Sequence, residues 1–565
     1  KLKRYAEAEA NFLEAERASA EIKNTNNWVK ALLELGNVNR LTGKQAKALE
    51  YYDRTYELSE RYGIKEVLWR AAAGKAALLR VQGKREEALE WYARAVDIVE
   101  RLRAALKIDE FRNSFQVNKQ DLYQDIISLL VEMGRTEEAF NYLERSRSRS
   151  FIDLLGNQKL TLKNEVDQRQ LEHITKLSRR VDALAAEIAS FETAPQGLQE
   201  QYRETKTIYE EALLVLKQNN PALSSFVAVV PLTQGEVQRM LKPGVGLLSY
   251  KLAGDRTYVW LLKADGTLFY QVPAGKEQLA ALVKRYRSLV QRLEPVGEEV
   301  EALYGLLIGP VENDLQGLEY VGIIPDDALH YLSFAALKDK EGYLVDRYPI
   351  FYTPSASVLK YTFAKRGKAK QTKVLAVGNP DLGHYNYDLP LAELEARSIR
   401  WNFPDMDILT GSKATKEWLL ENISNYGIIH LAVHGEFDEF NPLLSSLWLA
   451  SPNPDNRRLT VKEVFSLDLK ADLVTLSACQ TGLGKLRAGE LIGLNRAFIY
   501  AGTHALLSAL WRVDDLSTSL LMKHFYRNYV RMDKAKSLRQ AQLRVKKDFP
   551  HPAYWAGMSL VGDYL

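Results

Sequence analysis

The chain has 565 residues, 46% of them hydrophobic and 26% charged, which is typical of globular proteins and long enough for three or four domains. A formal net charge of +4 is small for this length and argues against a protein dedicated to binding nucleic acid. The only cysteine is Cys479, which excludes an internal disulfide and a multi-cysteine zinc site.

Two features bear on where the protein works. No apolar run approaches the ~18 residues needed to cross a bilayer, so we expect no membrane segment and a cytoplasmic protein. The sequence opens at "KLKRYAEAEA", within what we interpret as a repeat, so we expect natural residues upstream and draw little from the missing signal peptide.

Residues 1–150 contain an internal repeat. The stretches "LTGKQAKALEYYDRTYEL", "VQGKREEALEWYARAVDI" and "EMGRTEEAFNYLERSRSR" each place a glycine five positions before an alanine. Equivalent alanines stand at Ala8, Ala48 and Ala88, two steps of 40 residues. The pattern predicts stacked helical hairpins and resembles the tetratricopeptide (TPR) family, with an irregular helical bundle as the alternative. A stacked array has a concave groove suited to a protein regulator or substrate.

Residues 151–225 are expected to form a helical hairpin linker. Two stretches with helical apolar spacing, "QLEHITKLSRRVDALAAEIASF" and "LQEQYRETKTIYEEALLVLKQ", flank "ETAPQG", which indicates a turn. We predict an antiparallel pair that acts as a spacer or brace.

Two α/β halves follow, residues 226–368 and 369–565. The first begins with "GVGLLSYKLAGDRTYVWLLKADGTLFYQV", which predicts a meander of strands, then a helix at "KEQLAALVKRYRSLVQRL" and a strand at "LEYVGIIP". The second alternates the strands "VLAVG", "YGIIHLAVH", "ADLVTLSA", "HALLSALW" and "MSLVG" with helices, one of them at "AGELIGLNRAFIYAG" and ending at Gly502. This alternation predicts a mainly parallel sheet covered on both faces.

His434 and Cys479 follow two of these strands. If the two strands are parallel neighbours, both residues lie at the edge where open parallel sheets bind ligands. An imidazole can take the proton of a nearby thiol, and the thiolate is a strong nucleophile. The backbone N–H groups of Gly435 and Cys479 could then face a developing oxyanion. On spacing alone a buried structural cysteine is the alternative, and His430, inside the apolar run, is expected in the core.

Five stretches in order resemble the CHAT family, bacterial caspase-like domains that are related to separase and frequently fused to TPR repeats. They are "HLAVHGEFDEFNPLLSSLWLA", "LSACQTGLG", "GELIGLNRAFIYAGTHALLSALWRVDD", "AKSLRQAQL" and "HPAYWAGMSLVGD", and "IIPDDALHYLSFAAL" resembles the family's upstream half. The resemblance covers residues 226–565 and implies a caspase-like fold of peptidase clan CD. It implies peptide-bond hydrolysis without a cofactor or metal, with His434 as general acid/base and Cys479 as nucleophile. The first half has no cysteine, so we interpret it as a pseudoprotease.

The resemblance also implies residues around the dyad. Asp515 in "LWRVDD" best matches the acidic residue that receives a basic P1 side chain in separase-like enzymes, with Asp514 beside it and Trp511 as an apolar wall. Alternatively the two aspartates cap the following helix, and one can cap while the other binds. Glu490 matches a Gly-Glu element and either orients the catalytic loop or caps the next helix.

The sequence therefore predicts a cysteine endopeptidase that cleaves proteins after a basic residue, with a TPR-like groove for a regulator or substrate. The competing hypothesis is a catalytically silent TPR–CHAT scaffold for protein–protein interaction. Nucleic-acid processing is disfavoured because the sequence has no metal-ligand carboxylate cluster or phosphate loop.

Overall fold

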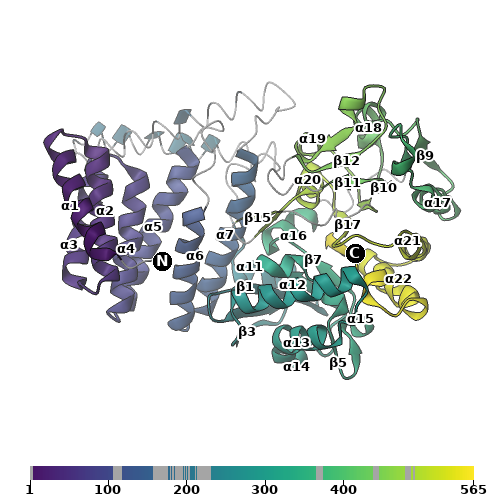
Figure 1. Ribbon diagram of the computed structural model, residues 1–565, viewed down its shortest axis with the longest axis horizontal. Helices are drawn as coiled ribbons and strands as arrows, with labels where there is room; N and C mark the ends of the chain where they lie inside the picture. Colours follow the sequence, from purple (N-terminus) through teal and green to yellow (C-terminus); the bar gives the residue numbers. More distant parts are fainter. Residues whose placement is uncertain are drawn as a thin grey trace. The chain divides into compact units, whose positions relative to one another are not determined.

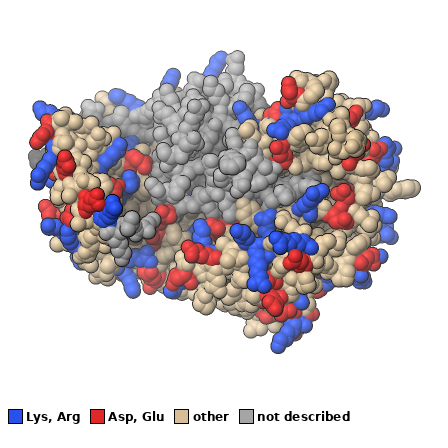
Figure 2. Space-filling view, in the orientation of Figure 1, with Lys and Arg blue, Asp and Glu red and all other residues tan. Residues whose placement is uncertain are grey.

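A computed structural model describes residues 4–105, 117–156, 231–363, 373–436, 444–477, 485–487 and 490–565, with individual residues between 169 and 212. The chain divides into two compact units, Lys1–Pro231 and Leu232–Leu565 (Figure 1). On the face shown in Figure 2, the described acidic and basic side chains are intermixed. No described helix is both long and apolar enough to cross a membrane.

The first unit is helical, as predicted. Its described helices are α1 (Tyr5–Glu21), α2 (Thr25–Leu41), α3 (Gln45–Arg61), α4 (Lys65–Val81), α5 (Arg85–Ala105), α6 (Val117–Glu132) and α7 (Thr136–Gly156). From α1 to α7 each helix packs on the next, and α4 also contacts α2 and α6. The hairpin predicted within residues 151–225 falls mostly outside the described residues.

Small and aromatic positions of the repeat explain this packing. Ala48 and Tyr52 of α3 are fully buried. The ring of Tyr52 lies against Gly36 of α2 and Gly74 of α4, where a Cβ on Gly74 would come within 2.5 Å of the ring. Glycine at these two positions therefore lets three helices approach one aromatic side chain. The predicted helical repeat is confirmed.

The second unit is built on one sheet of eleven strands in the order β3-β2-β1-β4-β7-β18-β17-β14-β10-β8-β9. The strands are β1 (Val245–Leu252), β2 (Thr257–Lys263), β3 (Gly266–Val272), β4 (Tyr320–Ile324), β7 (Ile350–Tyr352), β8 (Val374–Pro380), β9 (Met406–Gly411), β10 (Ile428–Ala432), β14 (Leu473–Leu476), β17 (Ala505–Ala509) and β18 (Met558–Gly562).

Strand directions divide this sheet into two parallel runs. One run is β1-β4-β7-β18 and the other is β17-β14-β10-β8-β9, and they meet at the antiparallel pair β17–β18. Antiparallel β2 and β3 extend the first run. All residues of β10, β14 and β17 are buried, so both faces at the centre are covered. The predicted meander and mainly parallel sheet are confirmed.

Helices and small sheets surround this core (Figure 1). The helices used below are α12 (Lys276–Arg292), α17 (Pro390–Ser398), α18 (Lys416–Asn422), α20 (Leu494–Ala501), α21 (Asp515–Tyr529) and α22 (Lys534–Asp548). A three-stranded sheet joins β11 (Gly435–Glu436), β12 (Ser446–Trp448) and β13 (Arg458–Thr460), and a hairpin joins β15 (Lys485–Arg487) to β16 (Glu490–Ile492).

The helix predicted at "AGELIGLNRAFIYAG" is shorter than expected. Its first part is strand β16, whose Glu490 pairs with Arg487 in the hairpin, and α20 begins only at Leu494. Its end is as predicted, because Gly502 has a φ of 119° and a Cβ there would overlap the carbonyl oxygen of Leu469.

Candidate active site

The two strands expected to carry the dyad are parallel neighbours. Residues 428–431 of β10 pair with residues 473–476 of β14, and the N–H of Ser477 donates to the carbonyl of Leu431 at 2.9 Å. Both strands therefore end at one edge, where His434 and Gly435 follow β10 and Ser477 follows β14. Cys479 is outside the described residues, so its pairing with His434 stays a prediction.

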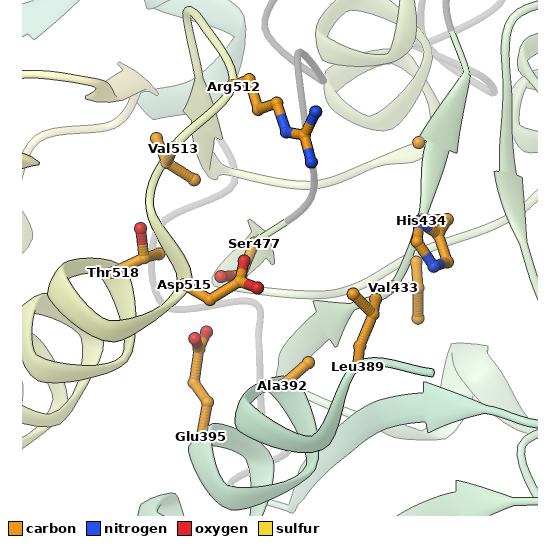
Figure 3. Close-up of a pocket in the computed structure, with 11 residues that line it drawn as sticks. Leu389, Ala392, Glu395, Val433, His434, Ser477, Arg512, Val513, Asp515 and Thr518 are labelled. Atoms are coloured by element: carbon orange, nitrogen blue, oxygen red, sulfur yellow. The ribbon is translucent and has the colours of Figure 1, made fainter. Parts of the chain in front are cut away.

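A cavity of about 380 Å³ opens at this edge (Figure 3). Four segments contribute its walls: the start of α17, the end of β10, the end of β14 and the turn from β17 into α21. The lining residues are Leu389, Ala392 and Glu395, then Val433, His434 and Gly435, then Ser477, and finally Arg512, Val513, Asp515 and Thr518.

The imidazole of His434 has a defined hydrogen-bond partner. Its Nε2 lies 2.8 Å from the carbonyl oxygen of Tyr387, and the Tyr387 ring stands edge-on to it with centroids 6.0 Å apart. A carbonyl oxygen can only accept, so Nε2 carries the proton. In the neutral ring Nδ1 is then the nitrogen that can accept a proton, which is the state a general base requires.

The two aspartates of "LWRVDD" have different roles. Asp514 is the N-cap of α21, and its side chain accepts the N–H of Ser517 at 2.9 Å. Asp515 is the first residue of the helix and lines the cavity. Loss of hydration raises the pKa of the Asp515 carboxyl, the charges of Asp514 and Glu395 add to this rise, and Arg512 and His434 oppose it. A cationic ligand placed beside this carboxyl would stabilise its ionised form.

A second carboxylate, Glu395, lies beneath Asp515. Figure 3 shows its carboxylate directed toward Asp515. Glu395 is only 3% exposed, and its Oε1 lies 2.9 Å from Nε2 of the fully buried His430, at an angle that does not make a hydrogen bond. Nδ1 of His430 contacts the Tyr526 hydroxyl at 3.2 Å, and that hydroxyl bonds Thr475 of β14 at 2.8 Å. His430 thus lies in the core, as expected, and behind the cavity wall.

Trp511 does not line the cavity, contrary to expectation. Its indole is 1% exposed, its Nε1 donates to the carbonyl of Ala553 at 3.1 Å, and its ring stands edge-on to Tyr286 of α12. The side chain therefore turns into the core between α12 and the chain end, while its neighbour Arg512 takes a place in the wall. Glu490 lies in β16, and the N-cap residue of α20 is Gly493.

Sequence reasoning missed Glu395, Arg512 and Tyr387. Arg512 stands inside the same "LWRVDD" motif, so the motif itself was an available signal. Glu395 has no signal in the sequence, because one acidic residue in a short helix is ordinarily on the surface. Tyr387 acts through its backbone carbonyl, which every residue has.

The upstream half has no corresponding constellation among its described residues. Asp326 accepts the N–H of Leu252 at 2.9 Å and pairs with Lys251 at 3.2 Å. The hydroxyl of Ser333 is buried and donates to the carbonyl of Ala556 at 2.7 Å. These groups hold the sheet and its neighbours together. No described group of three His, Cys, Asp or Glu residues could hold a metal ion.

The second unit is thus an α/β domain with a histidine-bearing cavity at the carboxyl edge of parallel strands. Residues 297–563 match the family model for the CHAT domain. The chain joins this part to helical repeats of the TPR type.

Curated relatives share part of this organisation. The chain is similar to tetratricopeptide repeat protein 28 of Mus musculus, with 27% identity over 350 residues, and of Homo sapiens, with 27% identity over 322 residues. The matched regions are 52% and 47% of this chain but only 14% and 13% of those relatives, so the chain spans a small part of their length.

Two solved structures are also similar. The Saccharomyces cerevisiae separase–securin complex aligns with 8% identity and a TM-score of 0.42, covering 95% of this chain and 54% of that chain. The complex of Porphyromonas gingivalis RgpB pro- and mature domains aligns with 11% identity and a TM-score of 0.33, covering 47% of this chain and 69% of that chain.

Proposed function

We propose that this chain is a cysteine endopeptidase of the caspase-like CHAT type, which cleaves protein substrates after a basic residue. The observation that carries the proposal is the state of His434. This histidine lines a cavity at the carboxyl edge of β10, and its Nε2 is committed to the Tyr387 carbonyl. Nδ1 is left to act as the base, beside the strand whose continuation carries Cys479.

The first step would form a covalent intermediate. Nδ1 of His434 takes the proton of the Cys479 thiol, and the thiolate attacks the carbonyl carbon of the scissile peptide. The carbonyl oxygen becomes an oxyanion, for which the N–H groups of Gly435 and Cys479 are the donors we expect. As the tetrahedral intermediate collapses, the imidazolium gives its proton to the leaving amine and a thioester remains.

The second step would release the product. Water attacks the thioester carbonyl and gives a proton to His434. The thiolate then leaves, and the carboxylic acid product departs. Throughout, the Tyr387 carbonyl stabilises the imidazolium that forms in each half of the cycle, because it accepts a hydrogen bond from a charged donor.

Substrate choice would depend on Asp515. Its carboxylate lines the cavity with a raised pKa, and a guanidinium or ammonium group placed beside it would stabilise the charged form. Asp514 contributes charge but has its side chain engaged as a cap. We further propose that the TPR-like array binds a protein regulator or the substrate itself, since stacked helical repeats have a groove suited to such partners.

Alkylation of the single cysteine tests the dyad without knowledge of the substrate. At pH 6.5 a thiol with an ordinary pKa of about 8.5 is about 1% ionised. We expect iodoacetamide to modify Cys479 at least about tenfold faster than a free model thiol, and His434→Ala to remove the difference. His524→Ala is the matched control, because that histidine lies among basic side chains of α21 and α22.

Peptides ending in arginine before a fluorogenic amine then test turnover. We expect amine release by the parent and none by Cys479→Ala. If iodoacetamide modifies Cys479 only after denaturation, and at the same rate in the parent and in His434→Ala, the result would instead support the catalytically silent scaffold.

A further inference from the structure

Asn379 is the next-to-last residue of strand β8, which lies beside β10, and it has an unusual backbone conformation. Its φ is 49°, in the left-handed region that few non-glycine residues adopt, although asparagine is enriched there. The pairing of β8 with β9 shifts register between Gly378 and Pro380, so Asn379 is the extra residue of a bulge. Bulges of this kind redirect a side chain and are frequent next to active sites.

The redirected side chain ties a loop together. Oδ1 of Asn379 accepts the N–H of Leu389 at 2.6 Å, ten residues along the chain. Two further bonds hold the same loop from outside: Asp381 N–H donates to the carbonyl of Gly411 at 3.1 Å, and Arg457 donates to the carbonyl of Leu382 at 2.6 Å. The loop from residue 380 to 388 is thus closed at its base by one asparagine side chain.

This loop carries the carbonyl that His434 uses. Tyr387 stands two residues before Leu389, and its oxygen lies 2.8 Å from Nε2 of His434. The bond from Asn379 fixes the backbone at Leu389 and so fixes where the Tyr387 carbonyl points. Leu389 is also the N-cap residue of α17, which packs so closely on β8 that a Cβ on Gly378 would lie 2.6 Å from the backbone of Ala392.

We propose that Asn379 is a positioning residue for His434, which acts through the Tyr387 carbonyl to hold the imidazole with Nε2 protonated and Nδ1 toward the substrate. This inference rests on the proposed function. It assigns Asn379 no contact with the reacting atoms. Its role is to keep the hydrogen-bond acceptor of His434 in place.

Asparagine contributes two properties at this position, a side-chain hydrogen-bond acceptor and tolerance of the left-handed backbone conformation. Glycine would keep the left-handed backbone but lose the acceptor, whereas aspartate would keep the acceptor and adopt the same conformation. Alanine would lose the acceptor and strain the backbone. Asn379→Gly and Asn379→Ala therefore remove the contact in two different ways, and Asn379→Asp restores it.

The experiment measures the rate of alkylation of Cys479 by iodoacetamide from pH 5 to pH 9, using the full chain. A carbonyl that accepts from the imidazolium stabilises the thiolate–imidazolium pair, so its displacement should favour the neutral pair. We expect Asn379→Gly and Asn379→Ala to react about tenfold more slowly than the parent at pH 6.5, and their pH midpoint to move upward. Asn379→Asp should return the rate and midpoint toward those of the parent.

Asn379→Gly and Asn379→Ala leave every charge near His434 unchanged, so their comparison with the parent isolates the loop, whereas Asn379→Asp restores the acceptor and also adds one carboxylate. The charged or titratable groups on the elements around it are Asp515, Glu395 and Arg512 in the cavity, Glu436 with its ion-pair partner Arg458, Asp381, His384 and Asp388 in the loop, and Arg457, which bonds the loop. Asn422→Ala is the matched control, since it also removes an asparagine bond to backbone, to Trp418 in α18. It should alkylate like the parent.

The inference fails, and the proposed dyad is kept, in either of two cases. In the first, Cys479 of Asn379→Gly and Asn379→Ala is alkylated as fast as in the parent. In the second, these substitutions slow alkylation equally in a His434→Ala background, so that Asn379 does not act through His434. If the parent itself reacts like a model thiol and His434→Ala has no effect, the proposed dyad is wrong and the inference falls with it. The supporting result is slowing that disappears in the His434→Ala background.

Discussion

Asp515→Asn gives the sharpest test of substrate choice, because it removes one charge and changes little else in shape. Asp515 lines the cavity as the first residue of α21, while the cap of that helix is supplied by Asp514. The fold should therefore survive the substitution. A peptide with arginine before the scissile bond and the same peptide with citrulline, its neutral isostere, complete a double-substitution cycle with the parent and the variant.

The expected magnitude follows from where Asp515 lies. Truncating one partner of a buried, hydrogen-bonded charge pair costs about 2–5 kcal/mol. Asp515 is exposed before substrate binds, and Arg512 in the same wall offsets part of its charge, so we take the lower end of this range. We expect kcat/KM for the arginine peptide to fall about 100-fold, equal to about 2.7 kcal/mol, in Asp515→Asn.

The assay is the rate of amine release at substrate concentrations well below KM, for all four combinations. The citrulline peptide should lose far less than the arginine peptide on substitution. A coupling near zero between Asp515 and the arginine charge would refute the pocket assignment. So would faster cleavage after aspartate than after arginine by the parent.

The same substitution has a predicted effect on stability. Because the folded pKa of Asp515 is raised, its contribution is favourable at low pH and is lost as pH rises through the folded pKa. Asp515→Asn should therefore raise the free energy of unfolding at neutral pH by less than about 1 kcal/mol, since the group is exposed, and this should appear as a higher Tm that returns to the parent value in acid. A lower Tm at pH 7 would contradict this sign.

Three other substitutions have clear expectations. Asp514→Ala removes the N-cap of α21 and should lower the free energy of unfolding by about 1 kcal/mol in urea titrations. Gly502→Ala forces a Cβ onto the backbone of Leu469 at a φ of 119°, so it should cost more than about 2 kcal/mol, and an unchanged Tm would contradict the packing. Burial alone would raise the pKa of Asp472, but bonds to His504 and two other side chains hold it well below its ordinary value. Asp472→Asn should therefore destabilise most near pH 7, with the difference shrinking below about pH 4.

Much of the fold could be predicted because it follows from local pattern. Apolar, β-branched runs specify the buried strands on either side of the site, and parallel order then brings His434 to the same edge as the end of β14. The N-cap role of one of the two aspartates was also foreseeable from the sequence, and the structure gives it to Asp514.

The misses share a physical cause, which is tertiary contact without a local signature. Trp511 turns inward because Tyr286, more than 200 residues earlier, offers an edge for its ring. The helix predicted before Gly502 is the exception, because its first residues form a local hairpin in which β16 pairs with β15. Glu395 lies in the cavity because α17 packs closely on β8, which depends on Gly378.

The last strand, β18, links the two α/β halves, because it lies between them in the sheet. It is antiparallel to β17 of the second half and parallel to β7 of the first. Just beyond it, the ring of Tyr564 stacks on Phe351 of the first half at 4.4 Å and is 1% exposed. Arg539 of α22 donates to the carbonyl of Val345 at 2.8 Å. The last strand and helix of the second half are thus held in place by contacts with the first half.

These contacts predict that residues 373–565 do not fold alone. Burying a large apolar or aromatic side chain contributes about 1.5–3 kcal/mol, so losing the partners of Tyr564 and its neighbours would remove a sum comparable to the 5–15 kcal/mol stability of a domain. The bare edge of β18 would also favour aggregation. A site-specific protease sequence inserted between residues 364 and 372 separates the two cases. After cleavage the halves should elute together and retain the parent Tm, whereas the second half expressed alone should lack a cooperative transition. A soluble second half with its own sharp melting transition would show instead that the first half is an independent domain, and its role as a support for the catalytic sheet would have to be abandoned.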